Sequence, residues 1–164
     1  MHLIIEVIRK ITKEDNPLVA KLIRDVFDEH RVNPAGTVYV DPTTDALFEL
    51  HQVKDAFLYV VELNGKIVGS CGIFPTEGLP SGCAEIVKFY FLKEARGKGL
   101  GKKIFKICLN EAKKLGYTEI YLESLPKFAT AIDMYKKLGF SQLSSPLGNS
   151  GHYGCNIWMK KEIL

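Results

Sequence analysis

A glycine-rich stretch at residues 94–103, EARGKGLGKK, combines unshielded backbone with clustered positive charge. Gly97, Gly99 and Gly101 stand at every second position, among one arginine and three lysines. Glycine lets an anion approach the backbone and tolerates positive φ. The first turn of a helix offers free N–H groups and the positive end of its dipole. If a helix begins here, the stretch can hold a phosphate group.

Two common phosphate-binding patterns do not fit this stretch. In the P-loop pattern GxxxxGK[ST], Arg96 would stand at the first glycine and Lys103 at the hydroxyl residue. The dinucleotide pattern GxGxxG also fails, because these glycines are spaced GxGxG. No acidic residue ends a strand at the distance that a ribose would need. The residues alone therefore indicate a diphosphate site without naming its ligand.

The pattern of apolar residues predicts the elements that position this stretch. A strand at 85–92 precedes it, and a helix follows it as far as Gly116, with apolar residues on one face and lysines on the other. Further strands are expected at 4–8, on both sides of Asn64-Gly65, and at 118–124, 140–143 and 155–161; further helices are expected at 12–30, 45–51 and 127–138. The order β-α-α-β-β-β-α-β-α-β-β predicts an α/β fold with a mixed sheet flanked by helices.

Composition is that of an ordinary globular protein whose charge is unevenly spread. With 164 residues, 46% hydrophobic and 25% charged, the chain is expected to form one domain over residues 1–164. The net charge is +3, but residues 1–80 carry a net −4 and residues 81–164 a net +7. The basic half suits contact with an anion, although charge alone also fits a solvated basic face.

Cysteine usage and hydropathy bear on the compartment and on possible partners. The four cysteines form no CxxC, and no histidine pairs with them at zinc-ligand spacing, so no metal is expected. There is no signal-peptide pattern and no apolar run near 20 residues, so a cytoplasmic protein without a membrane partner is expected. No recognised nucleic-acid motif surrounds the basic patch, so no nucleic-acid partner is expected.

Two motifs in order resemble the GNAT superfamily of N-acetyltransferases. Residues 96–101, RGKGLG, are similar to its pyrophosphate loop, (Gln/Arg)-x-x-Gly-x-(Gly/Ala). Residues 131–140, AIDMYKKLGF, are similar to its A-x-x-x-Y-x-x-x-G-F junction between helix and strand. The resemblance covers nearly the whole chain. It implies the GNAT fold, with about six to seven strands and an acetyl-CoA cleft between two splayed parallel strands.

The resemblance also implies where the cofactor binds. Phe89, Tyr90 and Phe91 would pair with the pantetheine arm, and a backbone N–H, Phe91 being favoured, would bond the thioester carbonyl. The pyrophosphate would lie on the backbone N–H groups of Gly97, Lys98, Gly99, Leu100, Gly101 and Lys102. Arg96, Lys98 and Lys102 would add positive charge nearby.

Catalytic roles follow from the same resemblance. Tyr135 matches the tyrosine that protonates the departing coenzyme A sulfur; its alternative role is that of a core aromatic residue. For the general base the candidates are Glu123, slightly favoured, and Glu85, each of which would need a raised pKa. A solvent-facing role for both carboxylates, with a water as the base, is the third possibility.

The acceptor is not specified by the sequence. It should enter over residues 31–51 and 144–153, where His152, Tyr153 and Trp158 could line a pocket. A small-molecule or peptide amine, including an amino acid, remains open. Some relatives have a cofactor-contacting asparagine where this chain has Phe128. A non-catalytic acyl-CoA sensor is the alternative function, and a homodimer is left open.

Overall fold

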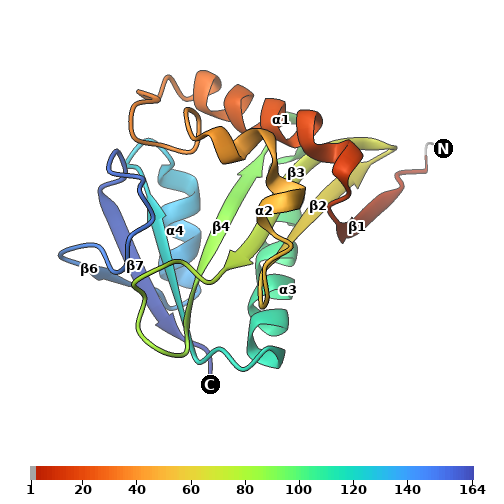
Figure 1. Ribbon diagram of the computed structural model, residues 1–164. Helices are drawn as coiled ribbons and strands as arrows, with labels where there is room; N and C mark the ends of the chain where they lie inside the picture. The colour runs from red at the N-terminus through yellow and green to blue at the C-terminus, as the bar shows by residue number, and fades with distance from the viewer. Residues whose placement is uncertain (1–2) are drawn as a thin grey trace.

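A seven-stranded mixed sheet runs through the computed structural model, which describes residues 3–164 (Figure 1). The strand order is β1-β2-β3-β4-β5-β7-β6. The strands are β1 (Glu6–Lys10), β2 (Phe57–Leu63), β3 (Lys66–Phe74), β4 (Cys83–Phe91), β5 (Glu119–Ser124), β6 (Ser141–Leu143) and β7 (Ile157–Glu162). The α-helices are α1 (Asn16–Glu29), α2 (Leu47–Leu50), α3 (Leu100–Lys114) and α4 (Ala129–Lys137). This architecture confirms the predicted α/β class, element order and sheet size.

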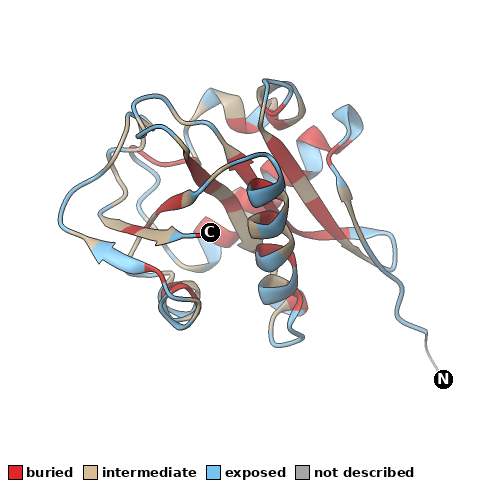
Figure 2. Cartoon of the chain, turned by 90° about the horizontal axis from the view of Figure 1, so that it is seen from below, coloured by how far each residue is buried: buried red, intermediate tan, exposed pale blue. Residues whose placement is uncertain are grey.

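The helices cover both faces of the sheet and create two apolar layers. Alternate residues of β2 face the two layers. Tyr59 and Val61 pack with the α3 and α4 side chains, whereas Leu58 and Val60 pack with those of α1 and α2. This alternation follows from the period of two along a strand. Figure 2 shows the buried residues concentrated in the central strands, while the helices expose their outer sides.

The β2–β3 hairpin turns at Asn64-Gly65, as the sequence predicted. Both residues have positive φ, 51° and 80°, which a tight two-residue hairpin turn requires. The first strand, in contrast, lies at 6–10 rather than at 4–8. Its position is set by antiparallel pairing with β2, and Ile4 and Ile5 lie exposed beyond it.

The helices before β2 also differ from the prediction. The helix expected at 12–30 begins as a 3-10 turn, Lys13–Asp15, before α1. The helix expected at 45–51 is split into a 3-10 turn, Pro42–Asp45, and α2. Thr43 N donates to the Asp41 carboxylate at the start of the first piece, so side-chain capping sets this boundary.

Strands β4 and β5 pair in parallel and then separate, as the resemblance implied. Their pairing is limited to Cys83–Glu85 with Glu119–Tyr121. Beyond that point β4 stays paired with β3 and β5 with β7, so each strand follows its other neighbour. A register shift between Ser70 and Gly72 bends β4 at this place. The gap opens directly before α3, which begins at Leu100 after Gly99 in the left-handed conformation, φ 77°.

Within residues 3–164, every helix is too short or too polar to cross a bilayer.

Candidate active site

A cavity of about 1120 Å³ occupies the gap between β4 and β5. Its walls come from these two strands, the start of α3, α4, and the segments 38–51 and 149–155. Among the predicted catalytic and cofactor-binding residues, Lys98 alone does not line it. The lining residues among them are Glu85, Phe89, Tyr90, Phe91, Arg96, Gly97, Gly99, Leu100, Gly101, Lys102, Glu123 and Tyr135.

The glycine loop, residues 96–101, presents bare backbone to one end of the cavity. Gly97 and Gly99 have φ of 74° and 77°, a region that side chains rarely adopt. A Cβ added at either would have no atom within 4 Å, so the space in front of this backbone is open. At Gly101 the same Cβ would lie 3.2 Å from the Phe89 ring, so this glycine allows α3 to pack closely against β4. The loop and the free N–H groups of the first α3 turn together have the geometry that can hold an anion.

Arg96 ties the glycine loop to its surroundings. Its guanidinium donates to the Phe91 carbonyl from Nε (3.0 Å) and Nη2 (2.7 Å). It also forms a two-pronged ion pair with Glu29 of α1, at 2.6 and 2.9 Å. Lys98 and Lys102, in contrast, lie exposed beside the loop. Arg96 therefore acts in this structure as a connection between α1, β4 and the loop.

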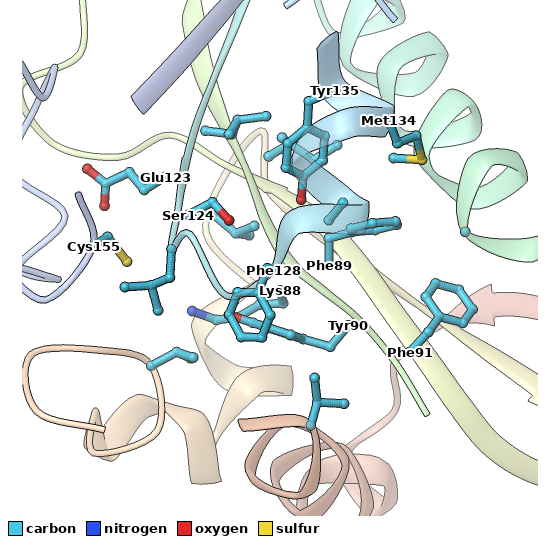
Figure 3. A pocket seen from close by; sticks show the side chains of 18 of the residues that line it. Lys88, Phe89, Tyr90, Phe91, Glu123, Ser124, Phe128, Met134, Tyr135 and Cys155 are labelled. Carbon is cyan, nitrogen blue, oxygen red and sulfur yellow. The ribbon is translucent and has the colours of Figure 1, made fainter. Parts of the chain in front are cut away.

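Tyr135 is buried among aromatic rings and directs its hydroxyl into the cavity (Figure 3). Its ring lies 5.4 Å from that of Phe105 and 6.1 Å from those of Phe89 and Phe140. No residue within 3–164 forms a hydrogen bond with the hydroxyl. Burial raises the pKa of Tyr135 well above its ordinary value, so the phenol stays protonated. The proton is thus held at a hydroxyl that is free to donate.

Glu85 and Glu123 line the same cavity in different environments. Glu85 is 5% exposed and accepts one hydrogen bond, from Thr76 Oγ1 at 2.7 Å. Burial, with the negative charge of Glu123 as a further cause, raises the pKa of Glu85 to about 7. Glu123 is half-buried and accepts from Tyr121 Oη (2.6 Å) and Ser150 Oγ (2.5 Å). Two hydroxyl donors thus hold the Glu123 carboxylate in place.

Lys88 is a site residue that the sequence reasoning missed. It is 8% exposed and lines the cavity from the bend of β4. The sequence signal for Lys88 was a second charged residue, after Glu85, in the mostly apolar strand EIVKFYF. Because strand alternation is broken at the bend, the sequence pattern could not tell whether Lys88 points to solvent or inward.

The segments expected on the acceptor side do meet at the cavity. His152 Nε2 lies 2.9 Å from Asp41 Oδ2 and joins the two segments. Tyr153 and Trp158, however, are not among the lining residues, and Tyr153 is 83% exposed. Its ring covers Gly36 instead.

Phe128, the departure from the family pattern, has an aromatic role in the wall of the cavity. It packs edge-on against Phe27 at 5.4 Å, His30 at 5.2 Å and Tyr90 at 6.1 Å. Figure 3 shows the Phe128 and Tyr90 rings next to each other. At residue 128, where some relatives have a cofactor-contacting asparagine, this chain therefore has an aromatic contact between α1 and the start of α4.

The cavity combines two splayed parallel strands, free backbone N–H groups at a helix start, a protonated phenol and a buried carboxylate. This combination is typical of a group transferase with a phosphate-bearing cosubstrate. The chain belongs to the acetyltransferase (GNAT) family, which it matches over residues 20–140. It is therefore an acetyl-CoA-dependent acetyltransferase.

Individual relatives agree with this membership. The uncharacterized N-acetyltransferase YjgM of Escherichia coli (strain K12) is 36% identical over 158 residues, which cover 96% of this chain and 95% of that protein. A GNAT-family acetyltransferase from Staphylococcus aureus Mu50 has a TM-score of 0.85 at 17% identity, covering 98% of this chain and 100% of that one. The Salmonella typhimurium yncA structure, a putative acetyltransferase with its cofactor acetyl-CoA, has a TM-score of 0.74 at 20% identity, with 96% and 94% covered. The structural likenesses establish the fold.

Proposed function

We propose that this chain transfers the acetyl group of acetyl-CoA to a primary amine by direct attack, with Glu85 as the base and Tyr135 as the acid. The observation that carries the proposal is one cavity that holds both a carboxylate whose pKa is raised to about 7 and a protonated phenol without a hydrogen-bond partner among residues 3–164. The acetyl-CoA in the yncA structure supports the choice of cofactor.

The cofactor would lie along β4 with its pyrophosphate on the glycine loop. Leu92 N–H donates to Val68 of β3, so the N–H of the preceding residue, Phe91, points to the opposite side. On that side β5 has moved away, which leaves the Phe91 N–H for the pantetheine arm or the thioester carbonyl. Arg96 would hold the loop in place, while Lys98 and Lys102 would add charge at the exposed end.

In the proposed reaction the acceptor nitrogen gives up two protons and the coenzyme A sulfur gains one, so one proton is released to solvent. Glu85 would accept a proton from the acceptor ammonium, and the neutral nitrogen would attack the thioester carbon. The new N–C bond forms as the C–S bond breaks, and Tyr135 would protonate the departing thiolate. The nitrogen then loses its second proton, which would restore the Tyr135 phenol, and Glu85 would release the first proton to solvent. Positioned proton transfer of this kind contributes about 10²–10⁴-fold in rate. Burial, with the negative charge of Glu123 as a further cause, keeps the pKa of Glu85 raised.

Two glutamine substitutions are expected to separate the carboxylates. Glu85 acts as a base only when ionised, so wild-type kcat/KM should rise with pH through about 7. Glu85→Gln should abolish that acidic limb and lower kcat by about 10²-fold or more. Glu123→Gln should keep the limb but move it to lower pH, because a charge that raises the Glu85 pKa is gone. The measurement is kcat/KM against pH for the three proteins, with acetyl-CoA affinity as the control.

If Glu123→Gln abolishes the acidic limb and Glu85→Gln keeps it, Glu123 is the base, which the sequence analysis slightly favoured. If both variants keep the wild-type limb, a water relay or the acceptor's own pKa sets it, and neither carboxylate is the base.

Thiol release from acetyl-CoA across a panel of amines tests the proposed function itself. Turnover with a primary amine supports it. Tight acetyl-CoA binding without turnover of any acceptor would instead support the acyl-CoA sensor. Tyr135 and Glu85 in one cavity favour the enzyme, because a sensor requires neither an acid nor a base.

The proposed unit is one domain over residues 1–164. The single sheet supports it, since the first and last strands of the chain belong to the same hydrogen-bonded order.

A further inference from the structure

Lys88 is a buried lysine that has no ion-pair partner in the part of the chain that the structure describes. Its side chain is 8% exposed, and within residues 3–164 no carboxylate lies within 4.0 Å of its ammonium. Lysine is almost never buried without pairing, because removal of an ammonium from water is costly. Figure 3 shows the nitrogen pointing toward the side of the cavity where Glu123 and Cys155 lie.

The backbone at Lys88 is held in an unusual conformation that aims this side chain. Its φ is 55°, in the left-handed region that a non-glycine residue seldom occupies. Ser70 Oγ donates to the Lys88 carbonyl at 2.6 Å, which fixes the bend where the β3–β4 register shifts. Bulges of this kind redirect side chains, and strained backbone concentrates at functional sites.

The negative groups nearest to Lys88 are already engaged elsewhere. Glu85 accepts from Thr76, and Asp41 accepts from Thr43 and pairs with His152. Burial lowers the pKa of Lys88, and the charges of Glu85 and Asp41 oppose that shift. Within residues 3–164 neither carboxylate forms an ion pair with Lys88. The ammonium thus faces the cavity with its hydrogen-bond donors free.

The neighbouring imidazole does not compete for an anion. His51 is buried, and its Nδ1 donates to the Leu47 carbonyl at 2.8 Å, which leaves a lone pair on Nε2. Nε2 has no hydrogen-bond partner within residues 3–164. Burial lowers the pKa of His51 to about 4, so the ring is neutral. Lys88 therefore supplies the positive charge next to His51 in this half of the cavity.

We propose that the acceptor is a free amino acid whose carboxylate binds the Lys88 ammonium while its amine faces Glu85 and Glu123. This inference rests on the proposed acetylation of a primary amine. It follows from opposite charges in one cavity: Lys88 has no ion-pair partner within residues 3–164, and the Glu85 and Glu123 carboxylates line the same cavity. The cofactor phosphates do not explain Lys88, because their expected site is the glycine loop, residues 96–101, which lies beyond the C-terminal end of β4. A lysine side chain or a peptide N-terminus carries no free carboxylate next to its amine.

The test compares each standard L-amino acid with its α-amide by thiol release from acetyl-CoA. Wild type should prefer the acid by about 10- to 100-fold in kcat/KM, the size of one hydrogen-bonded charge contact. Lys88→Met should lose that preference through a higher KM for the acid and change the amide by less than about 3-fold. Lys106→Met, on the exposed face of α3, is the matched control and should behave as wild type. Rates are compared above the acidic limb, where Glu85 is ionised in all proteins.

Three outcomes would overturn the inference. Equal use of acids and amides by wild type leaves amine acetylation intact but removes the carboxylate contact. An unchanged acid preference in a folded Lys88→Met variant assigns the contact to another group. If no acceptor turns over, the proposed function fails separately, and calorimetry of the amino acids with coenzyme A-saturated protein still tests Lys88. Absence of binding in that titration would overturn it.

Discussion

Tyr135→Phe is expected to lower kcat by about 10²–10⁴-fold while acetyl-CoA binds nearly as well as in wild type. The phenol would act only when the thiolate departs, because a thioester sulfur is a poor hydrogen-bond acceptor. An interaction made mainly in the transition state lowers kcat and kcat/KM together when it is removed. The substitution keeps the ring that packs against Phe105 and Phe140. The hydroxyl forms no hydrogen bond within residues 3–164, so its loss should not weaken the fold.

Steady-state kinetics with an identified acceptor measure this effect, beside a thermal melt and a cofactor titration. An unchanged kcat, with chemistry shown to limit the rate, would leave Tyr135 a core residue and the thiolate to a water. A large fall in melting temperature would mean that the hydroxyl stabilises the fold, contrary to the structure.

Gly99→Val is expected to weaken acetyl-CoA binding by at least about 10- to 100-fold, from the usual cost of placing a side chain in a disfavoured backbone region. Gly99 has φ 77° and directly precedes the first turn of α3. A β-branched residue resists this conformation, so the loop must change shape or bear the strain. The open space in front of Gly99 would also receive the valine methyl groups, in the volume that the pyrophosphate needs.

Gly116→Val provides a matched control at the other end of α3. Gly116 also has positive φ, 97°, with no atom within 4 Å of an added Cβ. It should lose comparable stability but bind acetyl-CoA normally, because it does not line the cavity. Calorimetry on both folded variants decides the question. Near wild-type affinity for Gly99→Val would contradict the phosphate role of the glycine loop.

Local patterns in the sequence determined the elements and one end of the site. The Asn64-Gly65 turn formed as predicted, because its two positive φ angles depend on the identities of those residues. The glycine loop and the start of α3 likewise depend on residues adjacent in the chain. The apolar periodicity of α3 and of β2 sufficed to assign their buried sides. The first strand was misplaced by two residues, since its register depends on β2, which lies about 50 residues away.

Only the tertiary structure determined which charged side chains are buried, which partners they contact and where they point. Glu85 and Glu123 look alike in the sequence, but burial raises the pKa of Glu85, while Glu123 receives two hydrogen bonds. The sequence suggests that Arg96 is free to bind phosphate, yet its guanidinium donates hydrogen bonds to the Glu29 carboxylate and the Phe91 carbonyl. Lys88 points into the cavity because β4 bends where its register with β3 shifts. Desolvation and pairing depend on neighbours distant in the sequence, so no local pattern could supply them.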